Sequence, residues 1–262
     1  MLLRMSWRNM FRNKRRTILN LVAISVNITV IIFFIGYMRY LTEDSYTRIP
    51  KYVTAHIQIH AADPETGEAD PQTMIRGAEQ IHQALDGIPG ILYHSDRMPL
   101  NLFILQGNDR YPLSGFAIEP EKESRFGVIE SSLQEGAYLS RSDQGVLIGT
   151  KLADMFGLGV GDTVTLAIRA PDGTQQTAEL NVQGIFETRY AIIDKSAVYL
   201  TIAHARELLG LQGETPEIRI ALEDRRNVDS VIGQLEARLP KEVLDGIRID
   251  PWTEYAKGTI QN

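Results

Sequence analysis

The feature that most constrains this chain of 262 residues is an uncharged apolar run over residues 18–38. A helix over this run is roughly 31 Å long, at about 1.5 Å rise per residue, which matches the hydrocarbon core of a bilayer. A buried helix of a soluble domain usually shows a polar stripe, which this run lacks. A cleaved signal peptide has a shorter apolar region, of about 7–15 residues, before a small-residue cleavage site. The sequence therefore predicts an uncleaved transmembrane helix over residues 17–40.

The charges on the two sides of this helix differ in sign. Residues 1–38 contain no Asp or Glu and hold six of the 27 basic residues, so the rest of the chain holds 21 basic and all 33 acidic residues. Positive flanks stay on the cytoplasmic side of a membrane, which predicts a cytoplasmic N-terminus and an extracytoplasmic acidic domain. An acidic domain also argues against nucleic-acid binding. The membrane-orienting basic residues are Arg4, Arg8, Arg12, Lys14, Arg15 and Arg16.

Short segments flank the predicted span. Residues 1–16 are predicted to form a basic amphipathic helix in the inner headgroup layer, with Trp7 at its border. Asn20 and Asn27 are seven residues apart and share a helical face, which favours packing against other helices within the membrane. Residues 41–51 are predicted to continue the helix as a stalk, which Pro50 ends.

Two β-α-β units are predicted near the ends of the remaining chain. Residues 52–60 alternate apolar and polar side chains as a strand does, residues 72–86 read as a helix and residues 91–98 as a strand. The same order recurs in residues 216–222, 227–239 and 246–250. Two such units can combine into one split, ferredoxin-like sandwich. We therefore predict an α+β domain in which residues 52–96 and 212–250 form the two β-α-β halves around an inserted subdomain.

The insertion, residues 97–211, is predicted to be rich in β-strands. Short helices are expected over residues 150–156 and 201–209, and the acidic run 119–123 is expected to be a solvated loop. Residues 169–176 contain Pro171-Asp172-Gly173 and are predicted to be a short hairpin connection. The predicted strands are residues 100–107, 111–119, 145–149, 162–169, 177–186 and 196–202.

No motif for catalysis, cofactor binding or metal binding stands out. The chain has no cysteine and no GxxxxGK[ST] sequence, so neither a disulfide nor ATP hydrolysis is expected. His56 and His60 are four residues apart on a predicted strand, where four residues span about 13 Å, too far to share one ion. Asp162 and Asp194 are interpreted as turn and cap residues. The sequence thus predicts a non-enzymatic protein with no cofactor of its own.

Several segments of the chain, in this order, resemble parts of one known family. They are residues 7–9 with 12–17, AHIQIH (55–60), GVLIGTKLADMFGLGVGDTVTL (145–166), VQGIFET (182–188), Asp194 with AVYLTIAHARELLG (197–210), and PWTEYAK (251–257). As an ordered set they resemble the MacB/FtsX-type permease subunits of bacterial ABC transporters.

The resemblance implies an inner-membrane protein whose extracytoplasmic core consists of two β-α-β halves plus a β-rich insertion. It implies a second permease subunit and a cytoplasmic ATPase partner, which binds ATP and Mg²⁺ and whose hydrolysis moves the domain outside. The implied output is export or extrusion of a lipoprotein, a peptide or a small molecule, or action on an extracytoplasmic protein. The hairpin at 169–176 has no room for the long hook of lipoprotein-release permeases, which lowers the expectation of lipoprotein release.

One departure from the family keeps a second function open. The family has four membrane spans, whereas this sequence contains one apolar run, and residues 251–262 are expected to begin a return towards a second span. The transporter subunit is therefore weighed against a single-pass scaffold or regulator of an extracytoplasmic partner, such as a cell-wall hydrolase.

Overall fold

The computed structural model describes residues 14–49, 55–63, 66–70, 73–107, 109–125, 128–169, 175–188, 190–211 and 213–252. The predicted amphipathic helix lies, apart from its last three residues, outside the described residues, as does the return segment beyond residue 252. The chain divides after Ile49 into two compact units, and each is described by itself.

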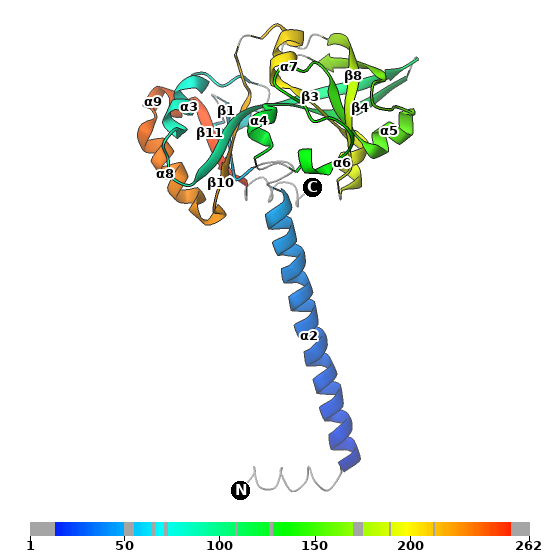
Figure 1. The fold of residues 1–262 in the computed structure, drawn as a ribbon. Helices are drawn as coiled ribbons and strands as arrows, with labels where there is room; N and C mark the ends of the chain where they lie inside the picture. The colour runs from blue at the N-terminus through cyan, green and yellow to red at the C-terminus, as the bar shows by residue number, and fades with distance from the viewer. Residues whose placement is uncertain are drawn as a thin grey trace. The chain divides into compact units, whose positions relative to one another are not determined.

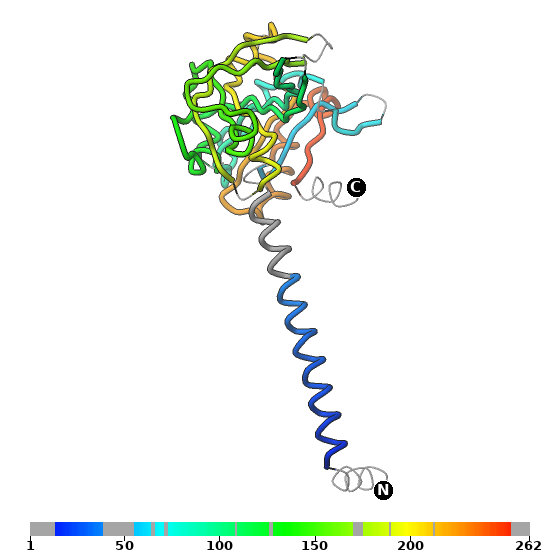
Figure 2. Tube along the Cα trace, turned by 90° about the vertical axis from the view of Figure 1, so that its right-hand side faces the viewer, coloured from blue at the N-terminus to red at the C-terminus, as the bar shows by residue number. Residues whose placement is uncertain are grey.

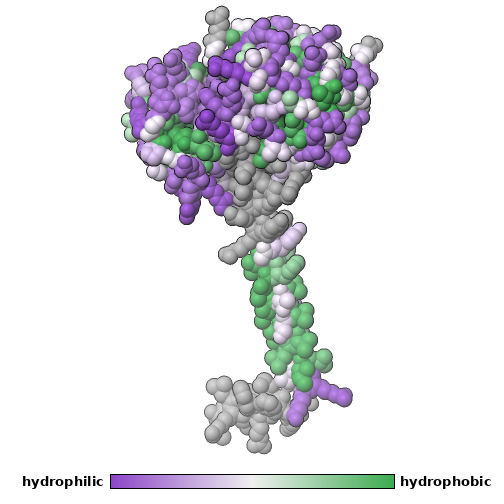
Figure 3. All heavy atoms as spheres, viewed as in Figure 1, coloured by the Kyte–Doolittle hydropathy of each residue, from purple (hydrophilic) through white to green (hydrophobic). Residues whose placement is uncertain are grey.

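The described residues of the first unit form one long helix, α2 (Lys14–Ile49), which contains the predicted span and reaches Ile49 in the predicted stalk. This segment contains no Pro and a single glycine, Gly36, so the two residue types that weaken a helix most interrupt it at one position at most. The large apolar side chains from Ile18 to Met38 are exposed, and Figure 3 shows the apolar surface that they form on the side of the helix facing the viewer. The part from Lys14 to Met38 is long and apolar enough to cross a membrane. An apolar surface of this extent requires lipid or protein around it.

The second unit begins with an open antiparallel sheet, which we call the β-α-β half (Figure 1). The strands β1 (Ile57–Ala62) and β3 (Ile91–Gln106) flank helix α3 (Ala78–Leu85), and β10 (Glu217–Leu222) and β11 (Ile247–Pro251) flank α8 (Val228–Arg238). The strands of these two β-α-β units interleave in the sheet in the order β11-β1-β10-β3, and neighbouring strands are antiparallel. The core between this sheet and its helices includes Ile57, Ile59, Ile81, Leu85, Ile218, Ile220, Val231 and Leu235.

The rest of the domain is a closed ring of strands, which we call the barrel half. Its members are β4 (Asp109–Ile118), β6 (Val146–Gly149), β7 (Thr163–Arg169), β8 (Gln175–Phe186), β9 (Ala197–Thr201) and the second part of β3. The ring closes because β7 pairs with both β3 and β8. Alternate residues fill the interior, as in small barrels generally, and they include Leu100, Leu102, Ile104, Val164, Leu166, Ile168, Val198 and Leu200.

Short elements complete the two halves. Helices α5 (Thr150–Phe156), α6 (Ala191–Ser196) and α7 (Ile202–Leu209) and strand β5 (Leu133–Gly136) belong to the barrel half. Helix α4 (Pro120–Glu123) and the 3-10 helix η2 (Glu130–Ser132) follow β4. The β-α-β half adds β2 (Ala69–Asp70), the 3-10 helix η3 (Arg225–Asn227) and α9 (Lys241–Leu244).

Three sequence-based expectations about local structure were wrong. The predicted strands 91–98 and 100–107 are strands but not separate ones: they form one continuous strand, β3, in which Pro99 keeps its register with Phe116 of β4. The predicted helix 72–86 shortens to α3, which begins after Gly77 in a left-handed conformation. The acidic run 119–123, expected to be a solvated loop, forms α4 and buries its last residue, Glu123.

The first and last strands of the sheet in the second unit, β1 and β11, are neighbours. Strand β1 pairs with β11, so that Ile57 lies opposite Pro251, and the Trp252 N–H donates to the His56 carbonyl over 3.1 Å. Figure 2 shows the two segments side by side. Just before β1, the buried Ala55 has φ of 56°, a left-handed conformation that costs an L-residue about 1–2 kcal/mol.

Candidate functional site: the polar junction between the two halves

Strand β3 belongs to both halves of the domain, and its midpoint is the junction between them (Figure 1). Residues 91–97 pair with β10, and residues 97–106 pair with β4. Arg97 lies where the pairing partner of β3 changes from β10 to β4, opposite Glu217 of β10 and Ile118 of β4. Because side chains alternate across a strand, Arg97 and Asp96 point to opposite faces of β3. The junction therefore has two polar faces.

The first face carries a buried cluster of charges. Glu123 of α4 accepts hydrogen bonds from Arg97 Nη1 over 3.5 Å and from Arg219 Nη1 over 3.2 Å. Glu217 lies 3.7 Å from Arg219 Nε and accepts a hydrogen bond from Gln58 Nε2 over 2.9 Å. All five side chains are buried, and both arginines are 1–2% exposed. The two cations and two carboxylates balance one another.

Aromatic rings extend this cluster into the barrel half. The guanidinium of Arg97 lies 4.3 Å from the centre of the Phe116 ring and 5.9 Å from that of Tyr199. A cation stacked on aromatic faces is stabilised by the ring quadrupoles, more strongly where both are desolvated. Phe116 lies on β4 and Tyr199 on β9, so Arg97 contacts strands that belong only to the barrel. The cluster thus ties the open sheet to the barrel.

Burial shifts the proton affinities in this cluster. Burial raises the pKa of Glu123, with Arg97 opposing the rise and Glu217 adding to it. Burial also disfavours the charged form of Arg97, but Glu123, Tyr199, Glu217 and Tyr93 together outweigh this effect, and the pKa of Arg97 is raised. Among the described contacts, the buried Arg97 Nη2, Arg219 Nε and Ser95 Oγ atoms have no hydrogen-bond partner. A buried network that is only partly satisfied adds little net stability, but it favours one arrangement of its groups over others.

The second face of the junction is centred on Asp96. Its Oδ2 accepts a hydrogen bond from Arg206 Nη2 of α7 over 2.7 Å, and its Oδ1 lies 2.8 Å from His82 Nε2 of α3. Burial opposes ionisation of Asp96, but the hydrogen bonds and charges of His82 and Arg206 together outweigh it and lower the pKa of Asp96. The backbone N–H of Asp96 donates to Glu119 over 2.9 Å. One carboxylate therefore connects a helix of each half.

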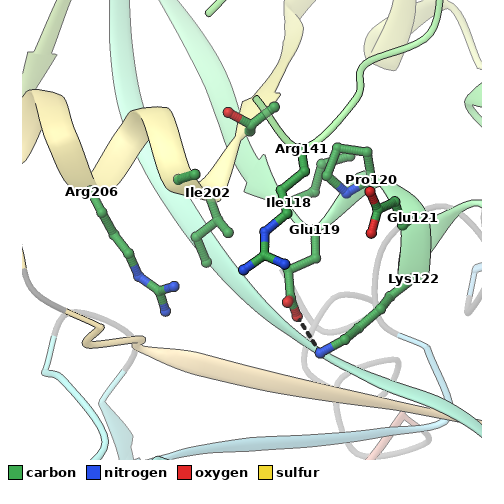
Figure 4. A pocket seen from close by; sticks show the side chains of 10 residues that line it. Ile118, Glu119, Pro120, Glu121, Lys122, Arg141, Ile202 and Arg206 are labelled. Carbon is green, nitrogen blue, oxygen red and sulfur yellow. Dashed lines mark hydrogen bonds and ion pairs between the residues drawn. The ribbon is translucent and has the colours of Figure 1, made fainter. Parts of the chain in front are cut away.

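A small cavity of about 140 Å³ opens beside this face, between α4 and α7 (Figure 4). Its charged lining contains Lys122, which forms an ion pair of 2.9 Å with Glu119. Arg206 also lines the cavity while holding Asp96. Apolar lining comes from Ile118 and Ile202. With carboxylates and cations both present, the cavity shows no preference for one sign of charge.

The sequence-predicted site residues lie elsewhere. Arg4, Arg8 and Arg12 are outside the described residues, and Lys14, Arg15 and Arg16 form the exposed first turn of α2. Asn20 and Asn27 are exposed on α2, where the Asn27 amide donates to the Ala23 carbonyl over 2.9 Å. Their roles in orientation and helix packing stay predictions.

The other residues that the sequence drew attention to have local structural contacts. Asp162 accepts a hydrogen bond from the Gly159 N–H over 2.7 Å, and Asp194 accepts one from the Thr188 N–H over 2.7 Å, so each holds a turn. His56 Nδ1 accepts from the Leu222 N–H over 2.9 Å. Within the described residues, no group of three or more His, Cys, Asp or Glu is placed to hold a metal ion.

Sequence reasoning missed the junction. One signal was available, since Glu217 and Arg219 alternate with Ile218 and Ile220 on a strand whose residues are all buried. Charged residues on a fully buried strand require partners of opposite charge. The partner Glu123 had no comparable signal, because the acidic run that contains it looks like a solvated surface segment.

The comparisons with known proteins agree with this architecture. Residues 17–238 match the family of MacB-like periplasmic core domains. The chain belongs to that family. No curated protein sequence matches it.

Two solved structures share the fold. The periplasmic region of MacB from Actinobacillus actinomycetemcomitans aligns with a TM-score of 0.55 and 14% identity, covering 82% of this chain and 96% of that one. The extracellular domain of the noncanonic ABC-type transporter YknZ from Gram-positive bacteria aligns with a TM-score of 0.53 and 12% identity, covering 74% and 98%. The resemblance to MacB/FtsX-type permeases is confirmed, and this chain carries the MacB-like periplasmic domain of an ABC-type transporter permease.

Proposed function

We propose that this MacB-like domain receives movements from the membrane, driven by a cytoplasmic ATPase partner, and converts them into export of a substrate outside the membrane. The observation that carries the proposal is the pairing of β1 with β11. The strand connected to helix α2 through residues 50–54 and the strand on which the chain leaves the sheet are hydrogen-bonded neighbours. A displacement of either chain segment reaches both strands together, and β1 pairs in turn with β10, which pairs with β3.

The first test of this proposal is association. The full-length protein, expressed with the ATPase encoded beside it, is expected to co-purify with that ATPase and to change its hydrolysis rate. Failure of the two proteins to associate would reject the transporter function. It would leave the single-pass scaffold as the better hypothesis.

The second test addresses the paired strands directly. The chain contains no cysteine, so a His60→Cys, Arg248→Cys double variant places the only two thiols opposite each other on β1 and β11. The Cβ atoms of such directly opposed residues lie about 4.5–5.5 Å apart, so a backbone adjustment of about 1 Å brings them to the roughly 3.5–4.5 Å of a disulfide. If the strands move together, oxidation leaves the ATPase response unchanged. Loss of the response on oxidation, with recovery on reduction, would show that the strands must separate. The two single-cysteine variants are the controls.

The location that we propose is the bacterial inner membrane, with the N-terminus in the cytoplasm and the domain outside. Support comes from the basic residues before the span, Lys14, Arg15 and Arg16 among them, since such flanks remain cytoplasmic. Protease added outside spheroplasts should digest the chain beyond residue 50 and spare the N-terminus. The opposite pattern would reverse the orientation.

The substrate that we favour is a peptide or small molecule. In support, strand β7 ends at Arg169 and β8 begins at Gln175, opposite it, so five residues connect the two strands. This connection is too short for the extended hook expected of a lipoprotein-release subunit. A second permease subunit completes the proposed assembly, and the Asn20/Asn27 face of α2 is the surface that we propose packs against other membrane helices.

We further infer that the β-α-β half is a ferredoxin-like sandwich. Its support is the strand order β11-β1-β10-β3 with antiparallel pairing throughout, and the two helices that contribute to one core with this sheet. In this arrangement each β-α-β unit places one strand between the two strands of the other.

A further inference from the structure

Two histidines from different elements form the centre of a chain of hydrogen bonds. His82 lies on α3 and His94 on β3, and their Nδ1 atoms are 2.8 Å apart. The other ring nitrogen of His82 lies 2.8 Å from Asp96 Oδ1, and that of His94 lies 3.0 Å from Asp86 Oδ1. The chain therefore runs from Asp86 through both imidazoles to Asp96.

The number of hydrogens on these rings follows from their partners. A carboxylate oxygen only accepts, so each Nε2 that faces one carries a hydrogen. Between the two Nδ1 atoms one nitrogen donates and the other accepts. The geometry thus requires three ring hydrogens on two imidazoles, one more than two neutral rings hold. Two neutral rings would leave one contact without a hydrogen, and two fully protonated rings would bring two N–H groups together.

The charges around the two histidines are balanced when the pair holds one proton more than two neutral rings. Asp96 is shared with Arg206 of α7, and Asp86 caps the C-terminal end of α3. Two carboxylates, one guanidinium and one imidazolium sum to zero. Further groups around the pair are Lys122 of α4 and Glu119, which precedes α4 and accepts a hydrogen bond from the Asp96 N–H. Arg238 of α8 donates to the Asp86 carbonyl.

We propose that His82 and His94 form a binding site for a single shared proton, which fastens helix α3 to strand β3 and is disrupted when acid adds a second proton. This function is independent of the transport role proposed above. Its effect extends beyond the pair, because Asp96 connects His82 to Arg206 and so α3 to the barrel half.

The electrostatics of His94 agree with the cost of a second proton. Burial lowers the pKa of His94; hydrogen bonding to Asp86 opposes this effect, and the charge of His82 adds to it. Carboxylates on the outer nitrogens of two histidines also occur around metal sites, where they orient the rings. Here no third ligand joins the two Nδ1 atoms among the described residues, so the site fits a proton.

The test measures backbone hydrogen exchange of α3 in the full chain held in lipid nanodiscs. Between pH 7.5 and pH 5, after correction for intrinsic exchange, the wild-type α3 amides are expected to exchange about 3–10-fold faster, the equivalent of roughly one lost hydrogen bond. His94→Gln should exchange faster already at pH 7.5 and lose the pH dependence. The His82→Gln, His94→Gln double variant should resemble the single variant.

The matched control is His60→Gln, which changes a histidine of the same half outside the chain of hydrogen bonds and should retain the wild-type pH dependence. A rate of α3 amide exchange that does not depend on pH in the wild type, or an unchanged pH dependence in His94→Gln, would overturn the proposal.

A second experiment uses the wild-type protein, so that its result does not depend on whether a variant folds. Nitrogen-15 NMR of labelled histidine at pH 7.5 should show three protonated nitrogens in this pair. Finding only two, or finding that EDTA changes the signals, would overturn the shared proton.

Discussion

The two halves of the domain share strand β3 but are built on different principles. The barrel half closes on itself through β7, and its interior is apolar. The β-α-β half is an open sheet, and its buried charges, Arg97, Arg219 and Glu217, meet Glu123 of α4 on the first face of the junction. Apolar packing is non-directional, whereas ion pairs and hydrogen bonds hold only in one geometry. The comparison suggests a stiff barrel attached to a sheet whose arrangement is set by polar contacts.

This difference bears on the proposed function. The chain enters and leaves through β1 and β11, which both belong to the open half. Forces from the membrane would therefore act first on the half held by directional contacts. The junction on β3 would then pass them to the barrel as a unit.

The largest expected effect is the loss of the carboxylate that the two buried arginines share. Glu123→Gln keeps the size of the side chain but leaves Arg97 and Arg219 with Glu217 as their remaining carboxylate. Breaking a buried ion pair by removing one partner typically costs about 3–5 kcal/mol. The free energy of unfolding of the full chain, measured by denaturant titration in detergent, should fall by about that amount.

Glu121→Gln is the matched control, since Glu121 lies exposed on the same helix. Its effect should stay within about 0.5 kcal/mol. Equal effects of the two substitutions would mean that the charge cluster does not hold the halves together.

The sequence could predict those features of the fold that depend on neighbouring residues, but not those that depend on contacts between distant ones. The apolar run and the charge asymmetry depend on local composition, and they located helix α2. The alternation of residues in 216–222 located β10 within a residue. Ring closure by β7 could not be read in this way, because strand partners are chosen by contacts between residues distant in sequence, such as Asn101 and Arg169.

The candidate site was less predictable than the fold. Arg97 looks like an ordinary surface residue between two strands, and only the continuity of β3 places it at the junction. Glu123 appeared to be solvated because four of the five residues in its run are polar or charged. Their pairing joins residues 26 positions apart, a separation at which no helical or strand period applies.

The next largest effect concerns the opposite face of β3. The pKa of Asp96 is lowered in the folded protein, so its charge stabilises the fold above the ordinary value of 3.8, and this contribution is lost as the pH falls through the lower folded value. Asp96→Asn should therefore lower the free energy of unfolding at pH 7 by about 1.5–3 kcal/mol. The difference from wild type should shrink at pH below 3.8. Asp154→Asn, an exposed control on α5, should show little effect at either pH. A pH-independent deficit in Asp96→Asn would assign the effect to packing instead.

A methyl group added to the barrel interior should destabilise the protein, whereas one added to the surface of the open half should not. A Cβ at Gly115 would lie 2.5 Å from Leu102 Cδ1 and 2.9 Å from Leu100 Cβ, inside the barrel. Gly115→Ala should cost about 1–3 kcal/mol by overpacking. The same change at Gly233, in the exposed part of α8 with nothing within 4 Å, should stabilise the protein by about 0.5–1 kcal/mol. Thermal unfolding of both variants checks the sign, and a neutral Gly115→Ala would show a less tightly packed barrel.

The smallest effect tests strain at the point where the chain enters the open half. Ala55 and Ala221 belong to one small buried cluster, but only Ala55 has a positive φ, of 56°. Replacement by Gly removes a buried methyl at both positions, worth about 0.8 kcal/mol, and relieves strain of about 1–2 kcal/mol only at Ala55. Ala221→Gly should therefore destabilise the protein, while Ala55→Gly should be close to neutral. Denaturant titrations should separate the two variants by about 1–2 kcal/mol. Equal losses would mean that the conformation of Ala55 carries no strain, and that the incoming strand is held by packing alone.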